Sequence, residues 1–342
     1  MYKIGIIGCG KIAQVRHIPE YTGNGKSEIT AYYDLNRERA EDLAGRFGGK
    51  AYGSVEALLE SGVDAVSVCT ANNTHAEITL QALKAGKHVL CEKPMATTLE
   101  DCVKMTEAAS SSPGILMIGQ NQRFTKTHAK ARAMIAGGSI GKPFSFRTTF
   151  GHGGPETWSV DPGKNTWFFD KAKAAMGAMA DLGIHKTDLI QFLLGDTVSE
   201  VSAVVTTLDK KGADGSLIPV DDNAICIYRM KGGAVGTMTA SWTFYGREDN
   251  STVIYGTEGI MKIYTDPSAS IIVEHQDGTR ELYGVDAIQT NDNQTSSGVI
   301  DEFISSIEKG KSSVPASSVL PAMKAVFAAL ESAETGKTVI IK

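Results

Sequence analysis

Short apolar runs alternate with longer amphipathic stretches along the first third of the chain. The runs have the length and composition of buried strands, because a strand covered on both faces is apolar almost throughout. Strand–helix alternation over about 120 residues is typical of a parallel, doubly wound sheet. We therefore predict an α/β domain of Rossmann type over residues 1–120, with strands in the run that opens at Tyr2 and in Ile29–Asp34, Ala51–Tyr52, Asp64–Thr70, His88–Glu92 and Ile115–Gly119.

The stretches between these runs carry helical periodicity or capping signals. Arg37–Phe47 places its apolar residues on one face, as a helix packed on a sheet requires. Pro19 is expected to end the first helix near His17. Thr97 and Glu100 have the spacing of a capping box. The predicted helices are Lys11–His17, Arg37–Phe47, a short helix capped at Ser54, His75–Ala85 and a helix that ends at Ser110.

The pattern changes from about Asn121 onward. A helix, Thr127–Ala136, and a strand, Phe144–Phe150, precede a long irregular segment at Gly151–Lys173, and loops of that length are usually functional or disordered. Short β-rich runs and two closing helices follow, so residues 121–342 are predicted to form a second, α+β domain. The runs are Glu200–Leu208, Ala224–Met230, Ala234–Thr243, Thr252–Gly256, Ile260–Tyr264, Ile271–Gln276 and Glu281–Tyr283, with hairpin turns at 231–233 and 277–278, and the helices are Val299–Lys309 and Ser318–Ser332.

The first strand runs into a glycine turn and a helix, in the stretch YKIGIIGCGKIA. Gly8 is expected to make the tight turn, and Gly10 has no Cβ, so a pyrophosphate can approach the backbone closely. Ala13 is small enough for the helix to pack on the strand. The free N–H groups at the start of the helix attract an anion. The stretch predicts a dinucleotide site, although a glycine turn without a nucleotide is the alternative.

Asp34 ends the second strand, where an acidic residue binds the adenosine ribose 2′-OH of NAD and repels a 2′-phosphate. Arg37 and Arg39 follow it, and either is able to turn toward a phosphate. We therefore predict NAD as the cofactor, with NADP as the alternative.

The composition is that of an ordinary globular protein and argues against nucleic-acid binding, a membrane span and a disulfide scaffold. The chain has 342 residues, 42% hydrophobic and 21% charged, with a formal charge of −5. This balance gives no support for a nucleic-acid partner, and no apolar run is long enough to suggest a membrane span. Five cysteines without a CxxC pair favour a reducing, cytoplasmic location over a disulfide scaffold.

Three titratable residues share one face of a predicted helix: Asp181, His185 and Asp188, at i, i+4 and i+7. Gly195 is expected to end this helix, so His185 lies near its positive end, which disfavours the imidazolium. A neutral imidazole is suited to take a proton from an alcohol while hydride leaves for a nicotinamide. A structural histidine and a metal ligand are the alternatives, but the sequence offers no further Cys or His set, so we predict no metal.

Lys93 follows the fifth strand at the carboxyl edge of the predicted sheet, where ligands bind in such folds. Pro94 favours an extended Lys93, which aims its side chain off the edge. Its ammonium is expected to stabilise charge on a reacting oxygen, and Glu92 to hold the ammonium by charge pairing. A solvated surface lysine is the alternative.

Six segments together resemble the glucose–fructose oxidoreductase/inositol dehydrogenase (Gfo/Idh/MocA) family. They are GIIGCGKIA, TANNTHAE, AGKHVLCEKPMATT, GQNQRF, GSIGKP and MADLGIHKTDL, in this order along the chain. The resemblance implies a two-domain NAD(P)-dependent oxidoreductase that acts on sugars, polyols or related alcohols and ketones. It also implies an open, mostly antiparallel sheet in the second domain and a catalytic trio of Lys93, Asp181 and His185. Leu182 stands where inositol dehydrogenases commonly carry a hydroxylated residue, so the resemblance supports the reaction type rather than inositol itself.

The remaining candidate residues have expected roles in binding the cofactor or the substrate. Asn121 and Arg123, after the sixth strand, are expected near the nicotinamide or substrate, with Asp188 as a substrate contact or a partner of one. Trp158 or Trp167 is placed to stack on a sugar or cover the cofactor, with plain packing as the alternative, and Tyr245 is a further substrate candidate. The predicted cofactor residues are Gly8, Gly10, Lys11, Ile12, Asp34, Arg39, Thr70, Asn72, His75, Glu92 and Lys93, and the predicted substrate residues are Asn121, Arg123, Trp167, Asp188 and Tyr245.

Two other activities fit the same residues: a non-redox sensor that binds a dinucleotide, and an elimination or hydrolysis assisted by transient oxidation. A large sheet built from these runs leaves one face to be covered, so we expect a homodimer or homotetramer. The C-terminal helix is free to pack back on the first domain.

Overall fold

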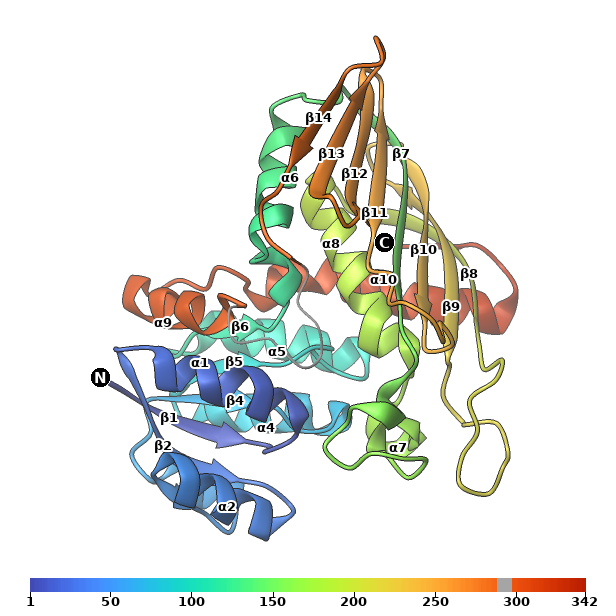
Figure 1. Ribbon diagram of the computed structural model, residues 1–342. Helices are drawn as coiled ribbons and strands as arrows, with labels where there is room; N and C mark the ends of the chain where they lie inside the picture. The colour runs from blue at the N-terminus through green and yellow to red at the C-terminus, as the bar shows by residue number, and fades with distance from the viewer. Residues whose placement is uncertain (288–296) are drawn as a thin grey trace.

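Two β-sheets organise the chain in the computed structural model, which describes residues 1–287 and 297–342. Within these residues a six-stranded sheet is built from the first part of the sequence and a nine-stranded sheet from the second. In Figure 1 the first sheet lies in the lower part of the molecule, in blue, and the second stands above it, in green to orange.

The first sheet has the order β3-β2-β1-β4-β5-β6, and each neighbouring pair is parallel. This confirms the predicted doubly wound sheet. The strand order reverses between β1 and β4, and ligands bind in the crevice outside the carboxyl ends at such a point. The strands are β1 (Tyr2–Ile7), β2 (Ser27–Tyr33), β3 (Lys50–Ala51), β4 (Ala65–Val68), β5 (His88–Cys91) and β6 (Leu116–Ile118).

The first helical segment differs from its prediction. The chain is helical from Lys11, passes through a π-helical stretch at Ala13–His17 and continues as α1 (Ile18–Gly23). The prediction that Pro19 ends the helix is therefore wrong. Pro19 lies directly after the π-helical stretch, at the start of α1, and the helix continues through it.

The other helices of this half follow the sequence closely: α2 (Arg37–Phe47), α3 (Val55–Leu59), α4 (His75–Lys84) and α5 (Leu99–Ser111). The side chain of Ser54 caps α3, as predicted. The cap of α5 lies one residue later than predicted, because Thr98 rather than Thr97 accepts a hydrogen bond, from the N–H of Asp101.

The second sheet has the order β14-β13-β12-β11-β7-β10-β9-β8-β15. Its neighbours are antiparallel except for β7 and β10, which confirms the mostly antiparallel sheet. The strands are β7 (Pro143–Gly151), β8 (Val198–Thr206), β9 (Asn223–Met230), β10 (Val235–Ser241), β11 (Thr252–Gly256), β12 (Gly259–Asp266), β13 (Ala269–His275), β14 (Arg280–Tyr283) and β15 (Val339–Ile340).

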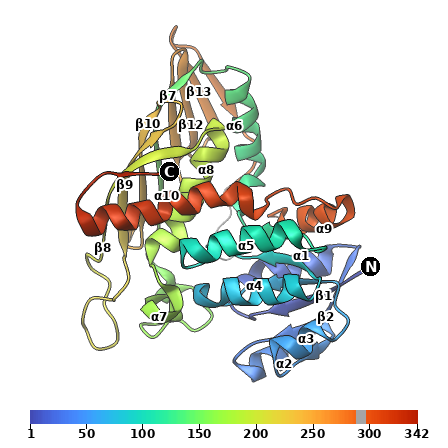
Figure 2. The ribbon, with the colours of Figure 1, turned by 180° about the vertical axis from the view of Figure 1, so that it is seen from behind.

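Helices of the second half cover one face of this sheet. Helix α8 (Ile184–Leu194) contacts β7 and β10, and α6 (Lys126–Ala136) contacts β12 and β13 (Figure 1). Helix α10 (Ala316–Thr335) packs on α5 as well as on β8. Figure 2, which shows the molecule from behind, has this helix crossing the front of the view. The short helix α7 (Lys171–Ala174) lies in the long irregular segment, and α9 (Val299–Lys309) packs beside α1.

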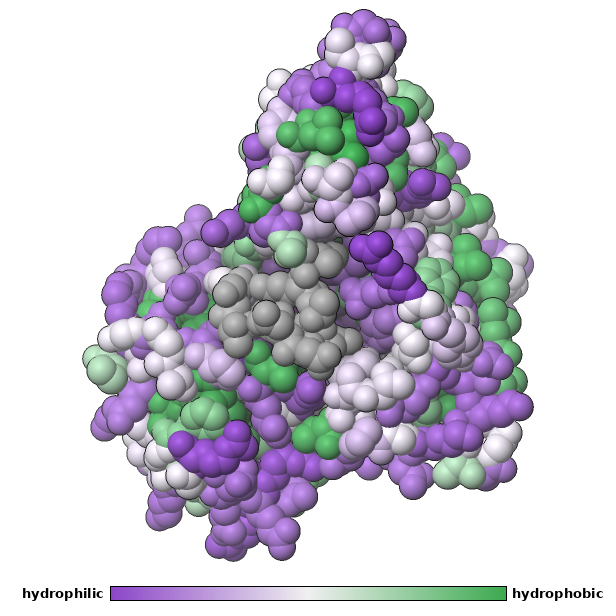
Figure 3. All heavy atoms as spheres, in the orientation of Figure 1, coloured by the Kyte–Doolittle hydropathy of each residue, from purple (hydrophilic) through white to green (hydrophobic). Residues whose placement is uncertain are grey.

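The opposite face of β8 and β9 carries exposed apolar side chains. Val204, Ile225 and Ile227 are 61%, 52% and 54% exposed, and Val204 lies directly opposite Ile225. Figure 3 shows hydrophobic residues gathered along the side of the molecule where these strands lie. Among the described helices, none has the length and apolar character that crossing a membrane requires.

Candidate active site

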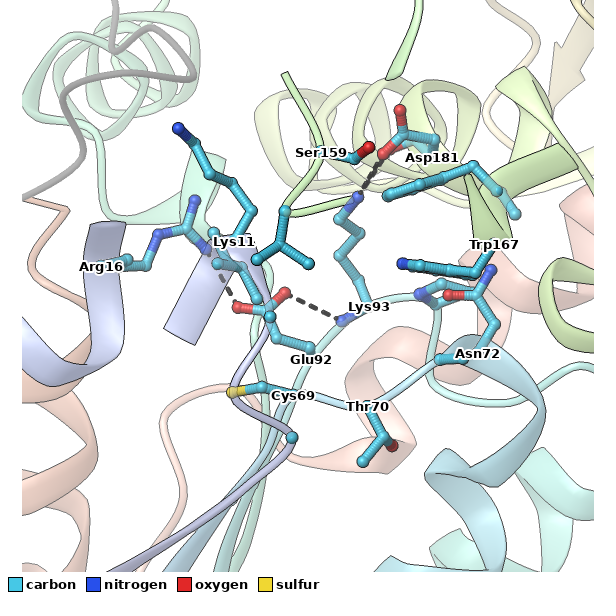
Figure 4. A pocket seen from close by; sticks show the side chains of 18 of the residues that line it. Lys11, Arg16, Cys69, Thr70, Asn72, Glu92, Lys93, Ser159, Trp167 and Asp181 are labelled. Atoms are coloured by element: carbon cyan, nitrogen blue, oxygen red, sulfur yellow. Dashed lines mark hydrogen bonds and ion pairs between the residues drawn. The ribbon is translucent and has the colours of Figure 1, made fainter. Parts of the chain in front are cut away.

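A cavity of about 470 Å³ lies between the two halves of the chain. It begins at the glycine turn after β1, passes the carboxyl ends of β2, β4 and β5, and reaches the segments around residues 150–168 and 176–185. Among its lining are the eleven predicted cofactor residues and the three predicted catalytic residues. Figure 4 shows this region with Lys93 at its centre.

The two glycines of the turn differ in their surroundings. Gly8 has a φ of +90°, and a Cβ there would lie 2.6 Å from the backbone of Cys69, so this position requires glycine. At Gly10 a Cβ would meet nothing within 4 Å. Gly10 therefore exposes backbone to the cavity, which is what a pyrophosphate at the start of a helix requires.

Asp34 is held at the end of β2 by backbone donors. Its Oδ2 accepts a hydrogen bond from the N–H of Cys9 at 2.7 Å, and its Oδ1 accepts one from the N–H of Asn36 at 2.8 Å. The first contact fixes the carboxylate to the glycine turn. Each carboxylate oxygen keeps a further lone pair with which to accept a ribose hydroxyl.

The turn after β4 contributes three predicted residues, Thr70, Asn72 and His75, and the side chains of the last two contact other segments. Asn72 donates from Nδ2 to the carbonyl oxygen of Ala174 at 3.0 Å, which joins this turn to α7. The ring nitrogens of the buried His75 lie 2.8 Å from the oxygen of Pro94 and 3.1 Å from that of Thr70. The pKa of His75 is lowered by burial. These contacts hold the turns after β4 and β5 together beside the cavity.

Glu92 lies in a buried cluster with two residues of the first helical segment. Its Oε1 accepts from Arg16 Nη1 at 3.0 Å and lies 2.9 Å from His17 Nε2. Burial acts to raise the pKa of Glu92, but His17 and Arg16 outweigh it and the pKa is lowered. Glu92 does not form the predicted direct ion pair with the Lys93 ammonium. Its hydrogen bond to that residue comes from the backbone N–H, at 3.2 Å (Figure 4), although the Lys93 charge also acts to lower the pKa of Glu92.

The Lys93 ammonium turns instead toward the second half of the chain. Its Nζ donates to Oδ1 and to the backbone oxygen of Asp181, each at 2.9 Å (Figure 4). The Lys93–Pro94 peptide bond is cis. Two of the predicted catalytic residues are therefore in direct contact although one follows β5 and the other precedes α8.

Two residues that the sequence did not indicate complete the surroundings of Asp181. Trp242 Nε1 donates to Oδ2 at 3.1 Å, and His152 Nε2 lies 4.0 Å from the same oxygen. Burial acts to raise the pKa of Asp181, but Lys93 and His152 outweigh it, so the pKa lies below its ordinary value. Asp181 is thus an ionised acceptor. Trp242 follows β10 and His152 follows β7, so no local motif marks either residue.

His185 lies one turn beyond Asp181, after a π-helical stretch at Met179–Gly183 that leads into α8. It is 7% exposed and lines the cavity, and its Nδ1 has no hydrogen-bond partner among the described residues. Burial and the nearby Lys93 charge hold its pKa well below the ordinary value. His185 is therefore a neutral imidazole whose ring lines the cavity.

Asn121 and Trp167 line the cavity, and the buried Oδ1 of Asn121 has no partner in the described part of the chain. Trp167 stacks on Phe168, with ring centroids 3.9 Å apart, and Trp158 meets the same Phe168 edge-on. The irregular segment thus presents an aromatic wall, of the kind that packs against the C–H face of a sugar ring.

The other three predicted substrate residues lie outside the cavity lining. Arg123 and Asp188 pair with each other, with 2.7 Å between Nε and Oδ2, and Arg123 also binds Ser318 at the start of α10. Tyr245 is 62% exposed and its hydroxyl donates to Asp209. Asp188 thus pairs with another predicted substrate residue, which is one of the two roles predicted for it.

The described residues hold no cluster of three or more His, Cys, Asp or Glu side chains with the spacing of a metal site. A dinucleotide fits the residues present: the open backbone at Gly10, the fixed carboxylate of Asp34 and the Lys93 side chain lie along one cavity.

Family models match both halves of the chain. Residues 2–120 match the model of an oxidoreductase family with an NAD-binding Rossmann fold, and residues 128–262 match the GFO/IDH/MocA C-terminal domain.

Individual proteins are similar over most of the chain. It is 30% identical over 290 residues to myo-inositol 2-dehydrogenase of Thermotoga maritima, covering 82% of this chain and 81% of that protein. It is 31% identical over 288 residues to 1,5-anhydro-D-fructose reductase of Ensifer adhaerens, covering 82% and 83%. A structure of levoglucosan dehydrogenase in complex with NADH and levoglucosan superposes with a TM-score of 0.86 at 26% identity, covering 99% of each chain.

Proposed function

The chain belongs to the GFO/IDH/MocA family of oxidoreductases, which bind NAD in a Rossmann fold, and from this premise we propose that it interconverts a hydroxyl and a carbonyl group of a sugar or polyol. The observation that carries the proposal is the contact of Lys93 with Asp181 beside a neutral His185, in the cavity that begins at the glycine turn. The names of the similar proteins, which cover inositol and anhydro-sugar substrates, support the substrate class.

His185 is the proposed acid–base group. In oxidation, a ring nitrogen of the neutral imidazole accepts the proton of the substrate hydroxyl, and in reduction the imidazolium returns it. Its lowered pKa keeps it in the neutral, accepting form at neutral pH, as an oxidation requires. NAD, when bound, supplies the acceptor for the hydride that leaves the substrate carbon.

Lys93 is proposed to bind the reacting oxygen. An ammonium has three donors, and two of those on Lys93 meet the carboxylate and backbone oxygens of Asp181. The third is available to the substrate, where it stabilises negative charge as the hydroxyl loses its proton. Asp181 orients Lys93 and balances its charge, and the Trp242 indole holds Asp181 in turn.

The glycine turn, Asp34 and the residues after β4 are proposed to hold the dinucleotide. The turn takes the pyrophosphate and Asp34 the adenosine ribose, which places the nicotinamide end toward Lys93. In this division residues 1–120 bind the cofactor, while residues 121–342 bind the substrate with Asn121, Trp167 and neighbouring side chains.

A substrate panel tests this function. Purified protein is mixed with NAD⁺ or NADP⁺ and a series of inositols, aldoses, anhydro-sugars and linear polyols, and reduced nucleotide is followed by its absorbance. Turnover of at least one of these alcohols is expected. Product formed without net NADH would instead indicate an elimination or hydrolysis with transient oxidation. Tight nucleotide binding without turnover of any alcohol or ketone would indicate a sensor.

We also infer that the protein is a homodimer or homotetramer joined through the outer face of the second sheet. The exposed Val204, Ile225 and Ile227 support this, because a soluble monomer rarely exposes a contiguous apolar patch of this kind. Light scattering on a size-exclusion column should give a dimeric or tetrameric mass, and Ile227→Lys should shift it toward the monomer. A monomeric wild-type protein would contradict this inference.

A reducing compartment such as the cytoplasm is inferred from the cysteines. All five are free and buried, and burial raises the pKa of Cys9, Cys91, Cys102 and Cys226 to about 12. Thiols in this state are unreactive packing groups. Localisation of a tagged full-length protein in its own cells tests the inference.

A further inference from the structure

Arg39 and Asp161 meet across the adenosine end of the cavity. Arg39 lies in the first turn of α2, and Asp161 lies in the irregular segment of the second half of the chain. The guanidinium Nη2 is 2.8 and 2.9 Å from the two carboxylate oxygens of Asp161. Both residues line the cavity; the Arg39 side chain is 19% exposed and the Asp161 side chain 66%. This ion pair is a direct link between the cofactor half and the substrate half of the chain.

The pair lies beside the carboxylate expected to bind the adenosine ribose. Arg39 Nη1 is 3.7 Å from Asp34 Oδ1. Asp34 cannot easily move, because the backbone N–H groups of Cys9 and Asn36 hold it. In dinucleotide sites of this type, an arginine near the ribose is the group that accommodates the 2′-phosphate of NADP. A 2′-phosphate can therefore be bound here only if the Arg39 guanidinium is available to pair with it.

In this structure Arg39 is already matched by negative charge. Two carboxylates, Asp34 and Asp161, face one guanidinium, so the local formal charge is −1. A 2′-phosphate would have to displace Asp161 from Arg39 and then lie beside both carboxylates. A 2′-hydroxyl meets no such repulsion.

Arg37 provides the contrast. Its Nε pairs with Glu41 at 2.7 Å one turn along α2, and its side chain is 78% exposed. It does not line the cavity. This pair joins two residues of one helix away from the cavity, so it does not restrain a side chain beside the nucleotide.

We propose that Asp161 is a positioning residue for cofactor choice: by holding Arg39 it favours NAD over NADP. Discrimination at the ribose then has two sources, Asp34 from the dinucleotide-binding half and Asp161 from the substrate-binding half. The inference rests on the proposed function only through cofactor binding, so it is tested without any substrate.

A purely structural role for the pair makes a different prediction. If Asp161 only anchored the irregular segment, its loss would weaken NADH and NADPH binding alike. If Asp161 restrains Arg39, the loss of Asp161 releases the guanidinium, which then binds the 2′-phosphate of NADPH and has no such group to bind on NADH. The ratio of the two dissociation constants therefore separates the two roles.

The experiment measures the Kd of NADH and of NADPH by fluorescence titration for the wild type, Asp161→Asn, Asp161→Glu and the control Arg37→Ala. Asp161→Asn should tighten NADPH by about tenfold, the worth of one charge-assisted hydrogen bond, and leave NADH unchanged. Asp161→Glu keeps the charge and should resemble the wild type, as should Arg37→Ala.

Two further backgrounds make the result decisive. In the Arg39→Ala background, adding Asp161→Asn should not change the ratio of the NADH and NADPH dissociation constants, because Asp161 acts through Arg39. In Asp34→Ser, which removes the other carboxylate, Asp161→Asn should again favour NADPH. An unchanged ratio in both the wild-type and Asp34→Ser backgrounds would overturn the proposal. Failure of the wild type to bind either nucleotide would contradict the proposed function and this inference with it.

Discussion

Lys93 and Asp181 are 88 residues apart in the sequence, and their side chains form an ion pair with 2.9 Å between Nζ and Oδ1. One residue follows the fifth strand of a parallel sheet, and the other lies in the π-helical stretch that leads into α8. The contact brings a cation and a carboxylate to the point where the two halves of the chain share a cavity. The proposed chemistry depends on this contact.

Removal of the Lys93 ammonium should abolish most of the turnover. Lys93→Ala is expected to lower kcat by about 10²–10⁴-fold, since it removes the donor that stabilises charge on the reacting oxygen. Steady-state rates with the substrate found in the panel measure the effect. The circular dichroism spectrum should match that of the wild type, which serves as the control for folding. A variant with wild-type kcat would remove Lys93 from the mechanism.

His185 should set the acid limb of the pH profile. The base must be neutral, and its pKa lies well below the ordinary histidine value because of burial and the Lys93 charge. As pH falls, kcat/KM for oxidation should therefore be maintained below pH 6.5 and be lost only near the lowered pKa. His185→Ala should lose about 10²–10⁴-fold in kcat. An acid limb at the ordinary histidine pKa that persists in His185→Ala would count against this role.

Trp242 is expected to act through Asp181. Trp242→Phe keeps a buried ring but removes the indole N–H that binds Oδ2. The free energy of unfolding should fall by about 1–3 kcal/mol, because a buried carboxylate oxygen loses a donor. The kcat should fall as well, while the Kd of NADH stays the same. Unchanged kcat would show that Lys93 alone suffices to hold Asp181.

The glycine turn offers a matched pair of substitutions. Gly10→Ala places a methyl group in open space and should leave stability unchanged but weaken NAD binding, because the pyrophosphate can no longer approach the backbone. Gly8→Ala meets the Cys69 backbone at a φ of +90° and should destabilise the fold by about 1–3 kcal/mol. Thermal unfolding and nucleotide titration distinguish the two. Wild-type NAD affinity in Gly10→Ala would place the pyrophosphate elsewhere.

Arg123 and Asp188 should behave as a structural pair. Arg123→Ala leaves the buried Asp188 without its cation and should lower the free energy of unfolding by about 3–5 kcal/mol. Because neither residue lines the cavity, the KM for substrate should not change. Denaturant unfolding and steady-state kinetics measure the two quantities. A raised KM at wild-type stability would restore the substrate contact that the sequence predicted.

The strand and helix bounds were predictable because each depends on a local signal. The apolar run of β4, the periodicity of α2 and the glycine that ends α8 are all read within a few residues. Pro19 shows the limit of such signals, because the switch from α-helical to π-helical geometry directly before it, which no local pattern marks, accompanies a helix that continues through the proline.

The site was predictable only where a motif or the family resemblance marked it. His152 and Trp242 escaped notice because each follows a strand of the second sheet, far in sequence from the Asp181 that it contacts. The partner of Glu92 was missed for the same reason, since Arg16 approaches it from a helix 76 residues earlier. Contacts between distant segments depend on the packing of the two halves, which no local pattern records.

Transfer of a deuterium label tests the central claim most directly. A substrate from the panel, deuterated at the carbon that bears the reacting hydroxyl, is turned over with NAD⁺, and the reduced nucleotide is analysed by mass spectrometry. The account predicts one deuterium in each reduced nucleotide formed by the wild type. His185→Ala should form this labelled nucleotide about 10²–10⁴-fold more slowly. Label lost to water, or product formed while the nucleotide remains NAD⁺, would contradict it.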